Sequence, residues 1–426
     1  MISFLPDILK EQIFKAINDL KYLEGDIEEI EFQDILSCEE IENDIQITED
    51  SQVCIYVGEC DFPRITVKEF IRMSLAIDEL SINSNQNYAK SSTEVYFLLD
   101  SSDYKTAEVL YNTFKRGNIF AQKENKPLSV LEKRVTTGEK TYTCSLFNGF
   151  CIFHLLVQKS GDFDEYAPAY SPDEYFVKIS CDQKIDMKEA DSLAHAYVFE
   201  LQSSFDLCLP FSTGRIAPFY PDRSDESLRG LESKLFPLIC GAGTAELLSL
   251  YNTAKATVDL DFKILGFTKV IEYIAPTIAQ KTLIENVTLK LTSLNVFKPT
   301  AKYISELGEI YEKHRNTSNR DSELIRLSII TAVSLDEIWD KIPNFIKGKQ
   351  TTVSEEKEQL AFLEKIAEYV YNTRNEIAHA KANYEKKGTE CPQKHKFDFC
   401  EMLDLISVRC IRWFALQPED KRVVLN

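Results

Sequence analysis

The stretch SEEKEQLAFLEKIAEYVYNTRNEIAH, residues 354–379, decides the fold class of the C-terminal part of the chain. Ser354, followed by two glutamates, is a typical N-cap of a helix. Apolar residues then recur at spacings of three and four, the period of one helical face, at Leu360, Leu363, Ile366, Ala367 and Val370. The stretch therefore predicts one long amphipathic helix over residues 354–381.

The sequence on both sides of this stretch has the same helical period. It predicts further helices over residues 243–257, 259–275, 278–294, 299–315, 320–334, 335–348 and 398–416. Pro276, Pro299 and Pro343 stand at or near the expected breaks, since proline interrupts a helix. Residues 242–426 are therefore expected to form an all-α helical bundle.

The sequence before residue 210 has a different pattern. Short β-branched and aromatic runs predict strands at residues 53–57, 95–99, 142–147, 151–157, 175–179 and 196–201. Asn148-Gly149 predicts a hairpin turn between two of them, and helices are expected around 67–80 and 103–116. The fold class is thus α+β, with a strand-rich mixed α/β domain over 1–210 as sensor or regulator, a proline-punctuated linker over 211–241, and the helical domain over 242–426.

The charge of the chain is unevenly distributed. Its 426 residues carry a net charge of −19, which argues against a nucleic-acid partner because such partners favour basic surfaces. Residues 1–100 hold 22 acidic and 7 basic side chains, whereas residues 241–426 hold 26 of each. The negative charge therefore argues against nucleic-acid binding by the N-terminal domain more than by the helical domain.

Cysteine usage and hydropathy indicate the cellular compartment of the chain. Eleven cysteines are scattered without a C-x-x-C pair, as is usual for reduced thiols, and no window approaches the roughly 18 apolar residues of a membrane span. The chain is therefore expected to be cytoplasmic and to avoid membranes. Cys391, His395 and Cys400 do not have the paired spacing of a zinc site, so no metal or other cofactor is expected.

Arg374 interrupts the apolar face of the long helix. A buried guanidinium needs an anionic or hydrogen-bonding partner, and a structural carboxylate and a bound phosphate are both candidates. Asn375 and His379 lie four residues apart and share a helical face, whereas Arg374 is offset from His379 by about 140°. The three side chains converge if Arg374 swings round, if the helix loosens near Ala378, or if a symmetric dimer completes the site.

These residue types suit RNA cleavage without a metal. His379 could take the proton of a ribose 2′-hydroxyl or give one to the leaving oxygen, because imidazole exchanges protons near neutral pH. Arg374 would hold the scissile phosphate, and Asn375 would orient the phosphate or the imidazole. The mildly basic loop that follows supplies weaker substrate-binding candidates, Lys381, Lys386 and Lys387.

The region from about residue 243 to 417 resembles HEPN domains of the Apea-like and abortive-infection kind. Their signature is Arg, a polar residue that is often Asn, three to five more residues and His, which RNEIAH at 374–379 matches. The segments LLSLYNTA at 247–254 and FKILGFTKVIEY at 262–273 look like their paired opening helices. The resemblance implies a homodimeric endoribonuclease with a composite active site, acting on RNA such as tRNA in antiphage defence or as a toxin, with a phage-derived or antitoxin partner at the N-terminal domain.

A second interpretation stays open. Arg374 could be a structural residue paired with Glu368, Glu376 or another carboxylate, and His379 could be a cation at the helix C-terminus. The chain would then be a non-catalytic protein that dimerises through the helical domain. Its acidic N-terminal domain would hold a partner.

Overall fold

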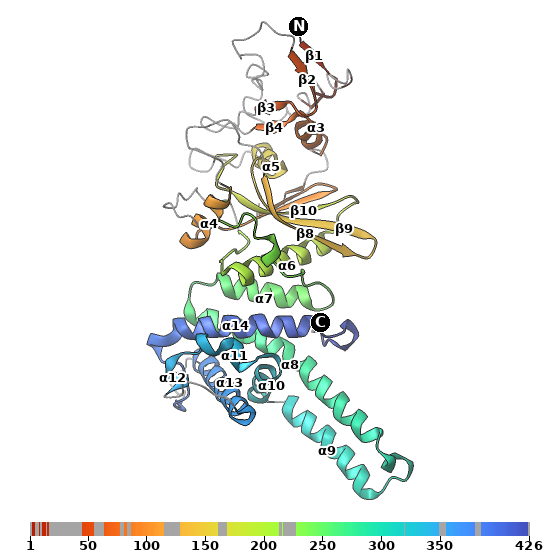
Figure 1. Ribbon diagram of the computed structural model, residues 1–426, viewed down its shortest axis with the longest axis vertical. Helices are drawn as coiled ribbons and strands as arrows, with labels where there is room; N and C mark the ends of the chain where they lie inside the picture. Colours follow the sequence, from red (N-terminus) through yellow and green to blue (C-terminus); the bar gives the residue numbers. More distant parts are fainter. Residues whose placement is uncertain are drawn as a thin grey trace. The chain divides into compact units, whose positions relative to one another are not determined.

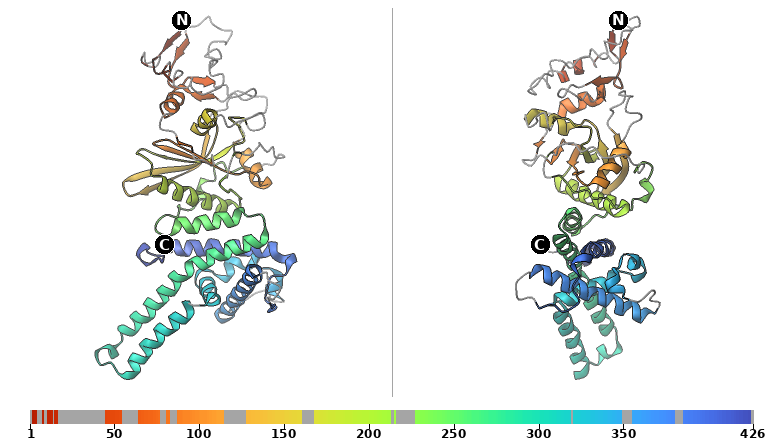
Figure 2. Two further views of the ribbon diagram at one scale, coloured as in Figure 1. Left: turned by 180° about the vertical axis from the view of Figure 1, so that it is seen from behind. Right: turned by 90° about the vertical axis from the view of Figure 1, so that its left-hand side faces the viewer.

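The computed structural model divides into two compact units, Met1–Leu238 and Ile239–Asn426 (Figures 1 and 2). The structure describes residues 2–4, 8, 11–13, 15–16, 45–54, 64–76, 81–82, 87–114, 128–160, 168–212, 215, 227–318, 320–348, 355–379 and 385–424. The first unit combines a sheet with helices and the second is helical, so the predicted α+β class is confirmed. Most of the acidic stretch before residue 50 lies outside the described residues.

A six-stranded antiparallel sheet is the largest sheet of the first unit. Its strands lie in the order β5 (Ser81–Ile82), β6 (Tyr88–Lys90), β7 (Glu94–Leu98), β10 (Tyr175–Cys181), β9 (Lys140–Asn148) and β8 (Leu128–Thr137). Val177 on β10 lies opposite Phe97 of β7 and Leu146 of β9. Two smaller sheets pair β1 (Ile2–Phe4) with β2 (Ile45–Ile47) in parallel and β3 (Gln52–Cys54) with β4 (Arg64–Thr66) antiparallel.

The helices described in this unit are α3 (Val67–Ala76), α4 (Tyr104–Phe114), α5 (Ile152–Ser160) and α6 (Met187–Phe205). The first two confirm predictions, but α5 and α6 overturn the strands predicted at 151–157 and 196–201. Every residue from 151 to 157 and from 196 to 202 is buried, so neither run has a solvent-exposed polar side. A helix buried all round loses its 3.6-residue period and cannot be told from a buried strand by pattern alone.

The hairpin of the sheet also differs from the prediction. It joins β8 to β9 at Gly138, whose φ of 61° suits glycine. β9 instead ends at Asn148, and the chain continues into α5. The Asn148 side chain donates hydrogen bonds to the carbonyls of Pro172 and Glu174 at 2.6 and 3.0 Å, so it fastens the end of β9 beside β10.

The described parts of residues 211–238 pack on the first unit. Phe211 forms a β-bridge with Leu99, and Leu228 and Leu235 are buried. The backbone N–H of Leu228 donates to the hydroxyl of Thr113 at 2.8 Å. The division between the two units accordingly falls after Leu238, near the end of the segment expected to be a linker.

The second unit is a helical bundle. Its helices are α7 (Thr244–Ala256), α8 (Leu260–Leu291), α9 (Ala301–Ser318), α10 (Asp321–Ala332), α11 (Leu335–Ile338), α12 (Asn344–Lys347), α13 (Glu356–Ala378) and α14 (Lys396–Ala415). The 14-residue helix predicted at 335–348 is therefore wrong: two single turns flank a 3₁₀ turn, Trp339–Lys341, and Pro343 caps the second. Figure 1 shows α13 and α10 beside α8 and α14 within this unit.

The helix break predicted at Pro276 is also wrong. Pro276 lies inside α8, which continues for 32 residues. Proline removes one backbone hydrogen bond, but Ile274, Ala275, Thr277 and Ile278 around it are all buried. Their packing offsets the lost hydrogen bond, so the segments predicted as two helices, 259–275 and 278–294, form one helix.

Candidate functional site

Helix α13 carries the motif and buries one face. Leu363, Ile366 and Val370 are buried as predicted, whereas Leu360 is 45% exposed and does not belong to the packed face. The helix begins after Glu355, which makes no side-chain cap, and Ser354 lies outside the described residues. Because α13 packs against α10 and α8, its last turn lies where these helices can contact Arg374.

Arg374 is partly buried and has carboxylate partners. Its Nε lies 3.4 Å from Oε1 of Glu272 on α8, and its Nη2 lies 3.9 Å from Oδ2 of Asp321 on α10. The partners Glu368 and Glu376 that the sequence suggested are engaged elsewhere: Glu368 accepts from Thr389, and Glu376 pairs with Lys386. The structure thus contains the carboxylate contacts that a structural role of Arg374 requires.

The contact between Arg374 and Glu272 is loose. Oε1 of Glu272 is buried and has no hydrogen-bond partner among the described residues. Burial raises the pKa of Glu272 above its ordinary value, and the neighbouring charge of Arg374 opposes this rise without cancelling it. An anion that contacts Arg374 directly could therefore compete with this carboxylate.

Asn375 and His379 lie beyond Arg374 at the end of the helix. The Nη1 group of Arg374 donates to Oδ1 of Asn375 at 3.0 Å, so the guanidinium has swung toward the Asn375 side. His379 is exposed and caps the helix, with φ −109° and ψ 37°, and its N–H donates to the carbonyl of Asn375. The described residues make no hydrogen bond to its imidazole, so the structure joins Arg374 to Asn375 and leaves the His379 side chain facing solvent.

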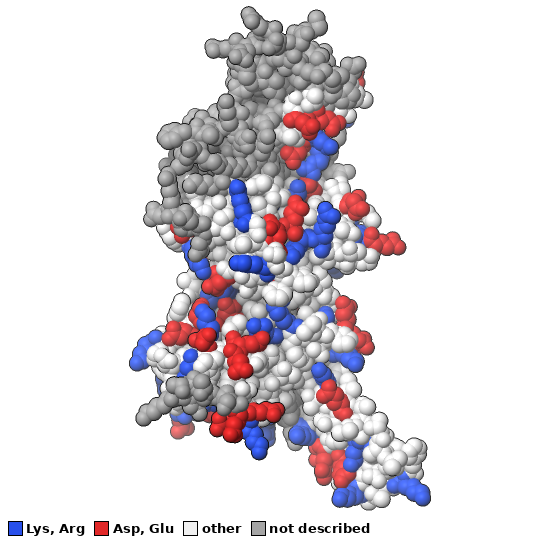
Figure 3. Space-filling model, in the orientation of Figure 1, with Lys and Arg blue, Asp and Glu red and all other residues white. Residues whose placement is uncertain are grey.

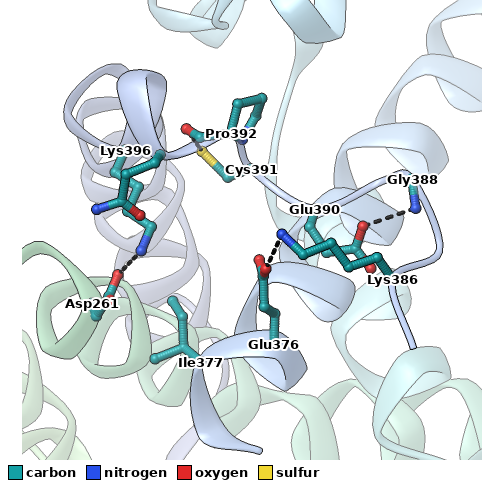
Figure 4. A pocket seen from close by; sticks show the side chains of 10 residues that line it. Asp261, Glu376, Ile377, Lys386, Gly388, Glu390, Cys391, Pro392 and Lys396 are labelled. Atoms are coloured by element: carbon teal, nitrogen blue, oxygen red, sulfur yellow. Dashed lines mark hydrogen bonds and ion pairs between the residues drawn. The ribbon is translucent and has the colours of Figure 1, made fainter. Parts of the chain in front are cut away.

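A pocket of about 630 Å³ adjoins the same helical turn (Figure 4). Glu376 and Ile377 line it from α13, and the Nζ of Lys386 lies 2.7 Å from Oε1 of Glu376. On the other side Lys396, at the start of α14, forms an ion pair with Asp261. A pocket of this volume is in the range that holds a small ligand.

The loop over this pocket is held by a buried carboxylate. Glu390 accepts from the backbone N–H groups of Lys387 and Gly388 at 2.7 and 2.8 Å (Figure 4). The Nζ of Lys387 lies over the ring of Tyr371, whereas Lys386 reaches the pocket. Lys381, the third lysine predicted to bind substrate, lies outside the described residues.

Sequence reasoning missed several residues around the motif. Glu272 and Asp321, which contact Arg374, and Asp261, which pairs with Lys396, come from helices far away in the chain, and nothing in their local sequence marks these contacts. Lys396, which lines the pocket from the start of α14, was not predicted either. Their proximity to the motif depends on how the helices pack.

Cys391, His395 and Cys400 have protein partners of other kinds. The two thiols donate to the carbonyls of Pro392 and Leu260, and burial raises the pKa of each to about 12. His395 lies 3.5 Å from Asp398 and beside the ring of Phe345. Within the described ranges, no three or more His, Cys, Asp or Glu residues are grouped as metal ligands would be.

Charge over the helical unit is mixed. On the face drawn in Figure 3, lysines and arginines are interspersed with aspartates and glutamates among the described residues. On this face a nucleic acid would therefore meet scattered cations and not a broad basic surface. In the part of the chain that is described, no helix combines the length and apolar character that crossing a membrane requires.

Comparison with known proteins gave no match for this chain, whether with family models, curated proteins or solved structures. The residues of the site therefore carry the functional argument.

Proposed function

We propose that the chain is a metal-independent endoribonuclease of the HEPN type whose site is Arg374, Asn375 and His379. One observation carries the proposal: the guanidinium of Arg374 is hydrogen-bonded to Asn375 at a helix end where the His379 imidazole is solvent-exposed. A guanidinium, an amide and an imidazole thus lie within two turns of one helix, and these are the groups that phosphate binding and proton transfer would need. This activity fits a cytoplasmic protein that acts in antiphage defence. A partner at its N-terminal unit would regulate it.

The proposed reaction is an internal transfer at phosphorus. The ribose 2′-oxygen attacks the adjacent phosphorus while one imidazole accepts its proton, and the bond from phosphorus to the 5′-oxygen breaks. The leaving oxygen receives a proton from an imidazolium, which the facing His379 of a second copy would supply in a homodimer. Arg374 stabilises the charge that develops on the phosphate oxygens. The products are a 2′,3′-cyclic phosphate and a 5′-hydroxyl.

The pocket beside α13 would receive a nucleoside of the RNA next to the scissile phosphate. Its carboxylates, on Glu376 and Glu390, accept hydrogen bonds, and Lys386 donates them. Such a mixture suits the edge of a base better than it suits a bare phosphate. A tRNA loop offers unpaired bases of this kind.

The first test is cleavage of total RNA and tRNA in EDTA, with the product ends determined. Arg374→Ala is expected to lower the rate by about 10²-fold or more, the usual effect of removing a donor to a developing oxyanion. Arg374→Lys should recover little of it, because lysine lacks the bidentate geometry. Intact RNA in every condition, or products ending in 3′-hydroxyls, would contradict the proposal.

Glu272 and Asp321 compete with a phosphate for Arg374, so removing one of these charges should strengthen RNA binding. Glu272→Gln removes the charge that competes with phosphate and is expected to lower the KM for RNA by up to about fivefold, because partly exposed ion pairs contribute about 0.2–1 kcal/mol. Glu285→Gln, on an exposed part of the same helix, is the matched control. Initial rates across RNA concentrations measure the effect, and an unchanged or higher KM would refute it.

The non-catalytic interpretation keeps specific support in the same contacts, because Glu272 and Asp321 already neutralise Arg374. In that case Arg374→Ala would weaken the packing of α13 against α8 and α10 and change no RNA. Thermal unfolding of this variant, run beside the cleavage assay, separates the two functions.

A further inference from the structure

One ion pair in the pocket beside α13 is largely open to solvent. Oε1 of Glu376 lies 2.7 Å from Nζ of Lys386, and the side chain of Lys386 is 73% exposed (Figure 4). Such an exposed pair is weak, because water screens both charges. An ammonium has three N–H groups and a carboxylate has about four lone-pair sites, so this single contact leaves both groups able to bind a ligand.

The other charged groups that line the pocket are engaged by the protein. Both oxygens of Glu390 accept backbone N–H groups of the loop, at 2.7 and 2.8 Å, and this residue is 9% exposed. On the other side Lys396 is 7% exposed and pairs with Asp261. Glu376 and Lys386 therefore form the charged part of the pocket that a ligand can contact most readily.

The order of hydrogen-bonding groups along this pair is specific. Because Lys386 contacts Oε1 of Glu376, a flat ligand edge beside the pair meets a donor, Nζ, and then two acceptors, Oε1 and Oε2. The matching edge has the order acceptor, donor, donor. Guanine has this order on its Watson–Crick edge, with O6, N1–H and the N2 amino group, whereas adenine, cytosine and uracil each have one donor group on that edge.

The remainder of the pocket suits a base that belongs to the substrate. Ile377, Cys391 and Pro392 line it and offer apolar surface to the flat faces of a base. Glu376 and His379 lie three residues apart at the end of α13, a spacing that puts two side chains on the same helical face. A base bound to Glu376 would therefore have its ribose near the imidazole.

We propose that Glu376 and Lys386 make the pocket selective for guanine, so that RNA is cut beside unpaired guanosines. Glu376 accepts hydrogen bonds from N1–H and from the N2 amino group, and Lys386 donates one to O6. Each bond has one charged partner, which strengthens it. The guanosine must be unpaired, because base pairing uses the same edge. The choice of RNA as the ligand rests on the proposed ribonuclease function, but the test measures binding and needs no cleavage.

The test is the binding of fluorescent oligoribonucleotides to the full-length His379→Ala protein, followed by fluorescence anisotropy. The probes are short oligouridines whose central residue is guanosine, adenosine, cytidine, uridine or inosine. The guanosine probe is expected to bind about 10- to 100-fold more tightly than the adenosine, cytidine and uridine probes, the usual discrimination by paired hydrogen bonds to a base. Inosine lacks the N2 amino group and should bind about tenfold more weakly than guanosine.

A second substitution in the same protein locates the preference. Glu376→Gln keeps the size of the side chain but replaces one acceptor with a donor, so guanosine and adenosine probes should bind about equally. Glu385→Gln is the matched control, because Glu385 is exposed on the same loop and is not one of the residues that line the pocket. It should keep the guanosine preference. Comparing probes within each variant cancels the general gain in RNA affinity that follows the loss of a negative charge.

Equal binding of all the probes, no measurable binding of any of them, or a guanosine preference that survives Glu376→Gln would overturn the proposal. Cleavage by the wild-type protein tests the ribonuclease separately. Cutting without a preference for guanosine would overturn the guanine pocket and leave the ribonuclease. Selective binding of guanosine without any cutting would support the pocket and contradict the ribonuclease.

Discussion

Replacing His379 with alanine is expected to slow RNA cleavage by about 10²- to 10⁴-fold, the usual range for removing a general acid or base. The alanine variant should keep its fold, because His379 is exposed at the helix end and only its backbone N–H makes a described hydrogen bond. Substitutions at such surface positions change stability by no more than about 0.5 kcal/mol. The measurement is the single-turnover rate on a labelled tRNA, alongside the melting temperature.

The matched control is His314→Ala, on α9, which should cleave RNA at the wild-type rate. If both histidine variants were as active as wild type, the cleavage would come from other residues or from a contaminant. Mixing His379→Ala with Arg374→Ala protein tests whether both copies contribute a histidine to one site. Because the proposed reaction uses one His379 as base and the facing His379 as acid, a mixed dimer lacks one of the two, and the mixture is expected to stay as inactive as the separate variants.

Replacing Glu174 with alanine is expected to destabilise the first unit by about 3–5 kcal/mol, since it takes the carboxylate away from the buried charge of Arg215 and from the buried ring of His154. Oε2 of Glu174 lies 3.1 Å from Nε2 of His154, and Oε1 accepts from Nε of Arg215 at 3.0 Å. His154 is fully buried, and side-chain exposure is 8% for Glu174 and 6% for Arg215. The loss should be as large as that of a major core residue.

Hydrogen–deuterium exchange of peptides from β9 and β10 measures this effect in the first unit. Tryptophan fluorescence provides an internal comparison, because Trp339 and Trp413, the two tryptophans of the chain, both belong to the helical unit. Glu139→Ala, at the exposed turn between β8 and β9, should change exchange very little. Equal protection in Glu174→Ala and Glu139→Ala would show that the buried cluster contributes little.

The same cluster predicts destabilisation in acid. The backbone N–H of Cys151 donates to Nδ1 of His154 at 3.0 Å, so the neutral ring carries its proton on Nε2 and donates it to Glu174. Burial lowers the pKa of His154, so the unfolded chain binds that proton more readily than the folded one. The contribution is present above about pH 6.5, the ordinary histidine value, and is lost as the pH falls below it.

Glu174 acts in the same direction at lower pH. Burial would raise its pKa, but the hydrogen bond from His154 and the charge of Arg215 outweigh burial and lower it. Its contribution is present above about pH 4.3 and is lost as the pH falls through the lowered value. Urea unfolding between pH 7 and 4, followed by circular dichroism, should show this decline, and a flat or rising stability would contradict it.

Local pattern predicted the helical unit well and the sheet unit less well, for a physical reason. The helices α7, α13 and α14 each have one solvent-facing side, so their sequences keep a 3.6-residue period. Helices α5 and α6 are buried over most of their surface, and their aromatic and β-branched residues resemble strands. Only packing against the sheet distinguishes these cases.

For the motif, the sequence by itself determined that Arg374, Asn375 and His379 end a long amphipathic helix, because helical periodicity and residue type are local properties. Only the tertiary structure decided the partners of Arg374. Glu272 lies 102 residues before it and Asp321 lies 53 residues before it, and the packing of α8 and α10 on α13 brings both carboxylates to the guanidinium. Side-chain contacts across such separations depend on the packing of whole helices, which no short stretch of sequence encodes.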